Sequence, residues 1–161
     1  MGELTPEQRG RVAEILAAVR PLAAEFYRLT GKPLGVTGEV AEQLVANLLV
    51  LTLVEARTAG YDATRPDRDG DLPLRIQIKA RAYPAGQDAG QRMGRLTPGM
   101  PCDAVVLALL DPETLDIREV WEAPFVAVAA RLVDPTSSSA KHGSFKVTEF
   151  VSLGTRVWPP T

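Results

Sequence analysis

Cysteine and histidine are almost absent from this chain of 161 residues, since each occurs once, as Cys102 and His142. A single cysteine excludes an internal disulfide and is compatible with a reducing cytoplasm. The same scarcity leaves too few sulfur and imidazole ligands for a zinc cluster. Cys102 stands at the start of an apolar run, which predicts a buried and inert thiol.

Long apolar runs and nucleotide-binding loops are also missing. No run approaches the roughly 18 residues that a transmembrane helix needs. The first residues, MGELTPEQRG, lack the basic and apolar blocks of a signal peptide. Neither GxxxxGK[ST] nor GxGxxG occurs, which argues against nucleotide-driven chemistry. We therefore expect a cytoplasmic protein with an ordinary globular composition, 45% hydrophobic and 24% charged.

Positive charge is scarce overall but locally concentrated. The net charge is −2, so no global signal for nucleic acid exists. Between residues 72 and 102, however, basic residues face a single acid, Asp88; they are Arg75, Lys79, Arg81, Arg92 and Arg95. Such a stripe is typical of a surface that contacts phosphates. A solvated strand face followed by a flexible loop explains the same pattern equally well.

The first 33 residues predict a helical extension. Thr5, Pro6 and Gln8 form a capping box with proline at the first helical position. Pro21 is expected to kink or split this helix, which ends near Gly31. Its apolar stripe predicts a face that docks on the rest of the protein; the members are Val12, Ile15, Leu16, Val19, Leu22, Ala23 and Phe26.

A second helix is predicted over residues 38–50, with Thr37 as its cap. This helix is apolar nearly all round, which predicts a position in the interior. Glu42 falls between Val45 and Leu49 on the helical wheel, where a carboxylate is costly unless a cation or metal compensates it. Glu42 therefore indicates either an interior ion pair with an arginine or a functional site.

The remaining sequence predicts an α/β domain over residues 37–160. Strands are expected near residues 51–57, 60–64, 74–81, 102–110 and 115–121, with a helix over 124–133. Residues 66–71 form the predicted turn before the third strand. Residues 83–101 and 134–144 predict loops, the first of them mobile.

Alternation in the strand 74–81 separates an apolar from a polar face. Leu74, Ile76 and Ile78 lie on one side, and the polar side carries Arg75, Gln77, Lys79 and Arg81. By itself this pattern is typical of any sheet with one buried and one solvent-exposed face. The strand follows an interior helix with an isolated glutamate and a shorter strand with Asp62, so its polar face is the main functional lead.

These features, in this order, resemble the PD-(D/E)XK, or restriction-endonuclease-like, nuclease superfamily. The resemblance rests on GEVAEQLVANLL, GYD and QIKAR, and covers residues 38–81 well. More narrowly, these segments are similar to uncharacterised bacterial domains with a Gln-x-Lys motif. The resemblance implies a central mixed sheet flanked by helices and a magnesium-dependent endonuclease activity. It also allows a homodimer, because many nucleases of this fold cut both strands as dimers.

The resemblance also implies roles for individual residues. Glu42 and Asp62 would bind Mg²⁺ or Mn²⁺, with Glu39 as a further candidate. Gln77 would be the third ligand and Lys79 the catalytic lysine. Oxygen ligands of this kind suit Mg²⁺, and a lysine on the same face is placed to act on the attacking water.

The same resemblance assigns the basic stripe to nucleic acid, with DNA as the expected substrate. Arg75 and Arg81 on the strand, and Arg92 and Arg95 in the following loop, would contact backbone phosphates.

Two departures from the superfamily's pattern stand against catalysis. Gln77 replaces an acid, and the sequence shows a glycine-rich loop where the superfamily has a crossover helix.

Other readings of the sequence are weaker or lie outside catalysis. DRDGD at residues 67–71 has the alternating acids of a calcium loop but lacks its glycine position and closing glutamate. Ser144 beside His142 lacks the nucleophile elbow of a serine hydrolase. The alternative to an enzyme is a catalytically inactive module of the same fold that binds DNA or a protein, as a defence-system or phage accessory.

Overall fold

The computed structural model describes residues 4–54, 60–70, 72–87 and 90–160. Within these residues the chain has an α/β fold with five helices and a mixed sheet of six strands in the order β1-β2-β3-β4-β5-β6. The strands are β1 (Thr52–Leu53), β2 (Ala63–Arg65), β3 (Leu74–Ala82), β4 (Ala104–Leu110), β5 (Ile117–Pro124) and β6 (Thr155–Trp158). The helices are α1 (Pro6–Thr30), α2 (Thr37–Leu49), α3 (Phe125–Val133), α4 (Ser138–His142) and α5 (Val147–Leu153).

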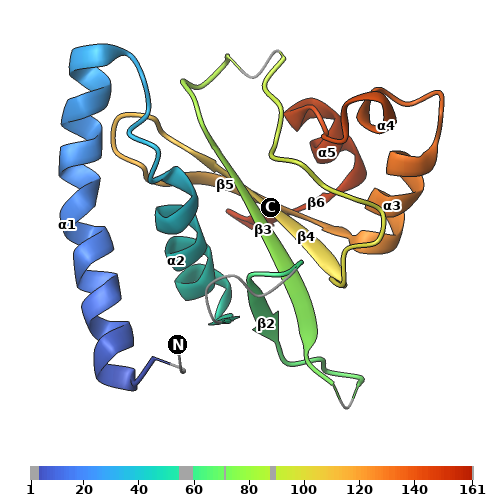
Figure 1. The fold of residues 1–161 in the computed structure, drawn as a ribbon, viewed down its shortest axis with the longest axis horizontal. Coiled ribbons are helices and arrows are strands. Elements are labelled where there is room, and N and C mark those ends of the chain that lie inside the picture. The colour runs from blue at the N-terminus through green and yellow to red at the C-terminus, as the bar shows by residue number, and fades with distance from the viewer. Residues whose placement is uncertain (1–3, 55–59, 71, 88–89, 161) are drawn as a thin grey trace.

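The sheet is antiparallel except at its centre, where β3 and β4 are parallel. Figure 1 shows α2 between α1 and the sheet, with α3, α4 and α5 grouped on the opposite side. Every residue of β4 is buried, as its unbroken apolar run predicts for a central strand. No helix in the described part of the chain is long and apolar enough to cross a membrane.

Two hydrophobic clusters cover the two faces of the sheet. On the first face, Val40 and Val45 of α2 pack with Ile76 and Ile78 of β3. On the second face, Leu107 of β4 belongs to a cluster that includes residues of α3 and α5. The predicted alternation along β3 is therefore confirmed for its apolar side.

Helix α1 begins and ends as predicted. The Thr5 hydroxyl accepts from the Gln8 amide at 3.2 Å, the Gln8 side chain accepts from the Thr5 amide at 2.8 Å, and Gly31 caps the end with φ 68°. The prediction of a split at Pro21 is wrong, because one helix runs through it. Arg20 donates to the Thr114 carbonyl at 3.1 Å, and this contact holds the helix against the turn between β4 and β5.

Helix α2 is sandwiched between α1 and the sheet, as its apolar surface predicts. Its start differs by one residue from the prediction, because Val36 is the N-cap and Thr37 is already helical. Ala41 and Val45 are fully buried, whereas Glu42 is half-buried at the edge of this contact. The helix therefore holds a carboxylate at the margin of the core.

Two further predictions need correction. The strand predicted over residues 51–57 is seen only at Thr52–Leu53, and residues 55–59 lie outside the described part. The loop predicted over residues 134–144 contains α4, which Ser137 caps by accepting from the Ala140 amide at 3.0 Å. Ser137 was not recognised as a cap because several serines follow one another there.

Residues 83–103 connect β3 to β4 without a helix in their described part. Met93 and Leu96 are each 2% exposed, and the Met93 and Leu96 amides donate to the carbonyls of Phe145 and Gly143, both at 3.0 Å. Each buried side chain of this size stabilises its position by about 1.5–3 kcal/mol. The segment is a loop, as predicted, but these anchors argue against mobility in its second half.

Candidate functional site

Asp62 and Gln77 meet where β2 and β3 separate. The antiparallel ladder pairs Ala63 with Ile76, which places Asp62 opposite Gln77 on the polar face. The Ile78 amide donates to Asp62 Oδ2 at 2.7 Å, and Gln77 Nε2 donates to the same oxygen. Gln77 is only 6% exposed. The Asp62 carboxylate thus takes the place of the next backbone acceptor and closes the end of the ladder.

Glu42 approaches the same place from α2. Burial first, then the charges of Asp62 and Glu39, raise the pKa of Glu42 to about 7, and Lys79 opposes this rise. Burial also raises the pKa of Asp62, against the Ile78 amide, Lys79 and Gln77, which favour its ionised form. The charge of Asp62 therefore acts on Glu42 from a separate element, in a partly desolvated place.

Lys79 lies two residues beyond Gln77 on the same face of β3 and is half-buried. Its charge acts on both Glu42 and Asp62. The loop passes close beside it, because a methyl group at Gly94 would lie 3.5 Å from Lys79 Cδ and 3.8 Å from Nζ. The structure thus brings Glu42, Asp62, Gln77 and Lys79 together, with Glu39 next to Glu42.

The raised pKa of Glu42 gives a prediction for stability. Because its folded pKa, about 7, exceeds the ordinary glutamate pKa of 4.5, protonated Glu42 favours the folded state at low pH, and this contribution is lost as pH rises through 7. Glu42→Gln should therefore stabilise the metal-free protein at pH 8 by about 1 kcal/mol, after discounting for solvent screening. Near pH 4.5 the variant and the wild type should unfold alike.

Urea unfolding at both pH values, with a chelator present, measures this difference. Glu14→Gln on the exposed side of α1 is the matched control and should show no gain at pH 8. An equal effect of Glu42→Gln at both pH values would contradict the pKa argument.

The predicted phosphate contacts on β3 are engaged within the protein. Arg75 Nε and Nη2 donate to Asp103 Oδ2 and Oδ1, both at 3.0 Å. Arg81 donates to the carbonyl oxygens of Arg92 and of Ala80, the latter at 2.9 Å, and burial lowers the pKa of Arg81. Both side chains stabilise the ends of the strand, and a contact of Arg75 or Arg81 with phosphate stays a prediction.

The loop arginines divide between two roles. Arg92 Nη1 donates to the Ser144 carbonyl at 2.7 Å and Nη2 donates to Ser138 Oγ at 2.9 Å, so Arg92 ties the loop to α4. Arg95 is exposed, and its side chain passes near Gly143. Of the predicted phosphate contacts, Arg95 keeps the accessibility that such a role requires.

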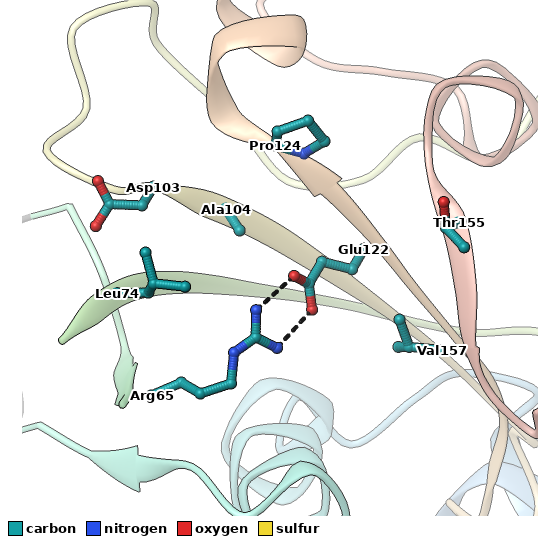
Figure 2. A pocket seen from close by; sticks show the side chains of 8 residues that line it. All are labelled: Arg65, Leu74, Asp103, Ala104, Glu122, Pro124, Thr155 and Val157. Atoms are coloured by element: carbon teal, nitrogen blue, oxygen red, sulfur yellow. Dashed lines mark hydrogen bonds and ion pairs between the residues drawn. The ribbon is translucent and has the colours of Figure 1, made fainter. Parts of the chain in front are cut away.

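A cavity of about 330 Å³, which no sequence pattern predicts, lies on the other face of the sheet. Figure 2 shows Arg65 of β2 reaching across it to Glu122 of β5, with N–O distances of 2.9 and 2.7 Å. Leu74 and Ala104 line its floor, on the side of the sheet opposite Gln77 and Lys79. Arg65 and Glu122 neutralise each other, so this cavity offers no unpaired charge from that pair to a ligand.

The other chemistries suggested by the sequence gain nothing from the structure. His142 Nδ1 lies 2.8 Å from the Ser138 carbonyl and 3.2 Å from Arg92 Nη2, and no bond to the Ser144 hydroxyl is found among the described residues. Cys102 is buried, as predicted, and this burial raises the pKa of its thiol to about 11, which disfavours the reactive thiolate. In the DRDGD turn, the Asp69 amide donates to Asp67 at 3.3 Å, and Asp71 lies outside the described residues.

Sequence reasoning missed two contributors to this site. The Ile78 amide fixes the Asp62 carboxylate, and Gly94 leaves room beside Lys79. Neither has a side-chain signal, because one acts through its backbone and the other through the lack of a side chain.

Within the described part of the chain, no three or more His, Cys, Asp and Glu side chains are grouped to hold a metal ion. Glu39, Glu42 and Asp62 therefore do not form such a group, and the candidate site consists of two carboxylates with the Gln77 amide as its third member. Comparison with known proteins finds no family that matches the chain and no curated protein that is significantly similar to it.

Proposed function

We propose that this protein is a metal-dependent nuclease that hydrolyses phosphodiester bonds, with DNA as its substrate. The observation that carries the proposal is the crowding of Glu42 and Asp62, both with a raised pKa, beside the buried Gln77 amide and Lys79. Raised pKa values of neighbouring carboxylates are costly for folding and are common at functional sites. A bound cation would offset the burial of both carboxylates and the repulsion of Glu42 by Asp62.

The donor atoms fit a hard divalent cation. Glu42 and Asp62 offer carboxylate oxygens, Gln77 offers an amide oxygen, and Glu39 is close enough to influence Glu42. Mg²⁺ and Mn²⁺ favour such oxygen ligands and keep part of their shell for water and phosphate. When bound, the ion would lower the pKa of a water molecule and neutralise charge on the phosphate.

The protein's own side chains would orient the water and the substrate and would stabilise charge on the phosphate. Lys79 would orient the attacking water and stabilise negative charge on the phosphate, because its ammonium group lies on the same face as Gln77. Gln77 and the Ile78 amide hold the Asp62 carboxylate in one orientation. The exposed Arg95 would contact the nucleic-acid backbone.

The order of α2, β2 and β3 supports the resemblance to the PD-(D/E)XK superfamily. A helix carries Glu42, a strand begins just after Asp62, and its antiparallel partner carries Gln77 and Lys79. A parallel neighbour, β4, then follows. The connection before β4 lacks the superfamily's crossover helix in its described residues, and this departure is one reason to test metal binding before cleavage.

The test is the thermal response to metal. A ligand at 100 times its Kd stabilises the folded state by about 2.7 kcal/mol, which corresponds to a Tm rise of about 5–10 °C for a chain of this size. The wild type should show this rise in Mg²⁺ or Mn²⁺, and Asp62→Asn should lose it. Asparagine keeps an acceptor for the Ile78 amide, so the variant should fold and match or exceed the metal-free wild type in Tm.

Asp69→Asn in the exposed turn is the matched control and should respond to metal like the wild type. A wild type without any metal-dependent shift would overturn the nuclease proposal. The neutral Gln77 would then favour a catalytically inactive module that binds DNA or a protein.

A further inference from the structure

Helix α1 carries an apolar row on its outer side. We call this row the α1 seam; its members are Val12, Ile15, Val19, Leu22, Phe26 and Leu29. They follow one another at alternating intervals of three and four residues, which is the repeat of a coiled coil. The same repeat keeps all six on one side of the helix.

The α1 seam is largely uncovered in the single chain. Helix α1 packs inward through the buried Ala23 and Ala24, whereas Ile15 is 47% exposed, Leu22 61% and Leu29 79%. Figure 1 shows α1 as the outermost element beside α2. These fractions leave on the order of 500 Å² of apolar side chain exposed, as much as the largest patch of a typical monomer.

We propose that the α1 seam pairs with the α1 seam of a second copy of this chain, in antiparallel orientation. The flanking charges set the orientation. Arg11 and Glu25 are exposed, lie on the same flank of the seam, and stand at equal distances on either side of Ala18. Arg11 also pairs with Glu14 of its own helix at 2.8 Å, and both side chains of this pair remain exposed. Antiparallel pairing about Ala18 brings Arg11 of each copy toward Glu25 of the other, and parallel pairing does not.

The geometry of a two-fold axis favours this arrangement. Ala18 is small and exposed, so two helices can approach closely where they cross. Two seams together would bury on the order of 1,000 Å², the size at which specific interfaces begin. Because α1 is separated from β3 by α2, pairing would leave Gln77 and Lys79 outside the interface. The inference is independent of the proposed nuclease function.

Light scattering coupled to size exclusion tests the interface with the full chain. The wild type should be a dimer at tens of micromolar, and Leu22→Glu should be a monomer with an unchanged circular dichroism spectrum, since Leu22 is 61% exposed. Ala17→Glu, on the exposed side away from the seam, is the matched control and should remain a dimer. A monomeric wild type, or a dimer that Leu22→Glu leaves intact, would overturn the proposal.

Charge reversal and cross-linking test the orientation. Arg11→Glu and Glu25→Arg should each weaken the dimer several-fold, and the double variant should restore it. Ala18→Cys should form an intermolecular disulfide under mild oxidation, because only antiparallel pairing places the two copies of this position on the same flank; Cys102 is 5% exposed and does not compete. A dimer of Ala18→Cys that does not cross-link would rule out this orientation.

Discussion

Lys79→Ala is expected to slow phosphodiester cleavage about 10²- to 10³-fold, the usual effect of removing one donor that stabilises charge in a transition state. The metal-dependent rise in Tm should survive, because Lys79 acts on the water and the phosphate. The measurement is cleavage of a plasmid and of branched DNA in Mn²⁺, together with the melting curve of each variant. Loss of cleavage with metal binding intact separates the lysine from the metal ligands.

The pH of this assay matters because Lys79 lowers the pKa of both Glu42 and Asp62. Removing its charge raises both pKa values, so protons compete more strongly with metal near pH 7. At pH 8.5 protons compete less with metal for both carboxylates, so metal binding of the variant should approach that of the wild type. Lys141→Ala, an exposed position on α4, is the control and should cleave normally. Unchanged cleavage by Lys79→Ala at pH 8.5 would remove Lys79 from the reaction.

The meeting of Asp62 and Gln77 could be predicted from the sequence because it depends on local rules. Alternation along residues 74–81 fixes which side chains share a face, and a short turn to the preceding strand makes the pair antiparallel. Side chains of opposed residues then lie on the same side, as the bond from Gln77 to Asp62 shows. Glu42 could be identified as a candidate residue because a carboxylate on an apolar helix surface costs free energy unless it is compensated.

The roles of the arginines could not be predicted, because their partners are distant in the sequence. Asp103, which binds Arg75, lies beyond the loop, and Ser138 and Ser144, which bind Arg92, follow β5 and α3. A count of charges along a segment does not show which of them are already neutralised. The sequence therefore does not show that Arg75 and Arg92 already have partners within the protein.

The apolar stripe of α1 shows that the packing partners of a helix cannot be predicted from its own sequence either. The pattern marks the whole band from Val12 to Phe26 as a docking face, but the helix turns its alanines, Ala23 and Ala24, to the protein. Small side chains allow α1 and α2 to approach closely. Periodicity identifies an amphipathic helix but does not state which part of a wide band meets its own chain and which part is left for another.

Gln77→Glu is expected to lower the stability of the metal-free protein and to raise its affinity for Mg²⁺. Gln77 Nε2 donates to Asp62 Oδ2 and lies 3.3 Å from the Ile78 carbonyl, in a position only 6% exposed. A carboxylate there loses the bond and faces a like charge, which should lower the free energy of unfolding without metal by about 1–3 kcal/mol at pH 8. At pH 5 the loss should shrink, because one of the crowded carboxylates takes up a proton.

Metal should rescue Gln77→Glu and raise its affinity for Mg²⁺ at least about tenfold, since a third carboxylate adds charge to the ligand set. Calorimetric titration with Mg²⁺ and melting curves in a chelator measure the two effects on one sample. Gln77→Met is the matched control: it removes the bond to Asp62 without adding charge, so it should lose stability but gain no affinity. If Gln77→Glu gained no more metal affinity than Gln77→Met, the Gln77 side chain would not face the ion, and the proposed metal site would be wrong. If it gained affinity and also cleaved faster than the wild type, the neutral amide would be what limits catalysis in the natural sequence.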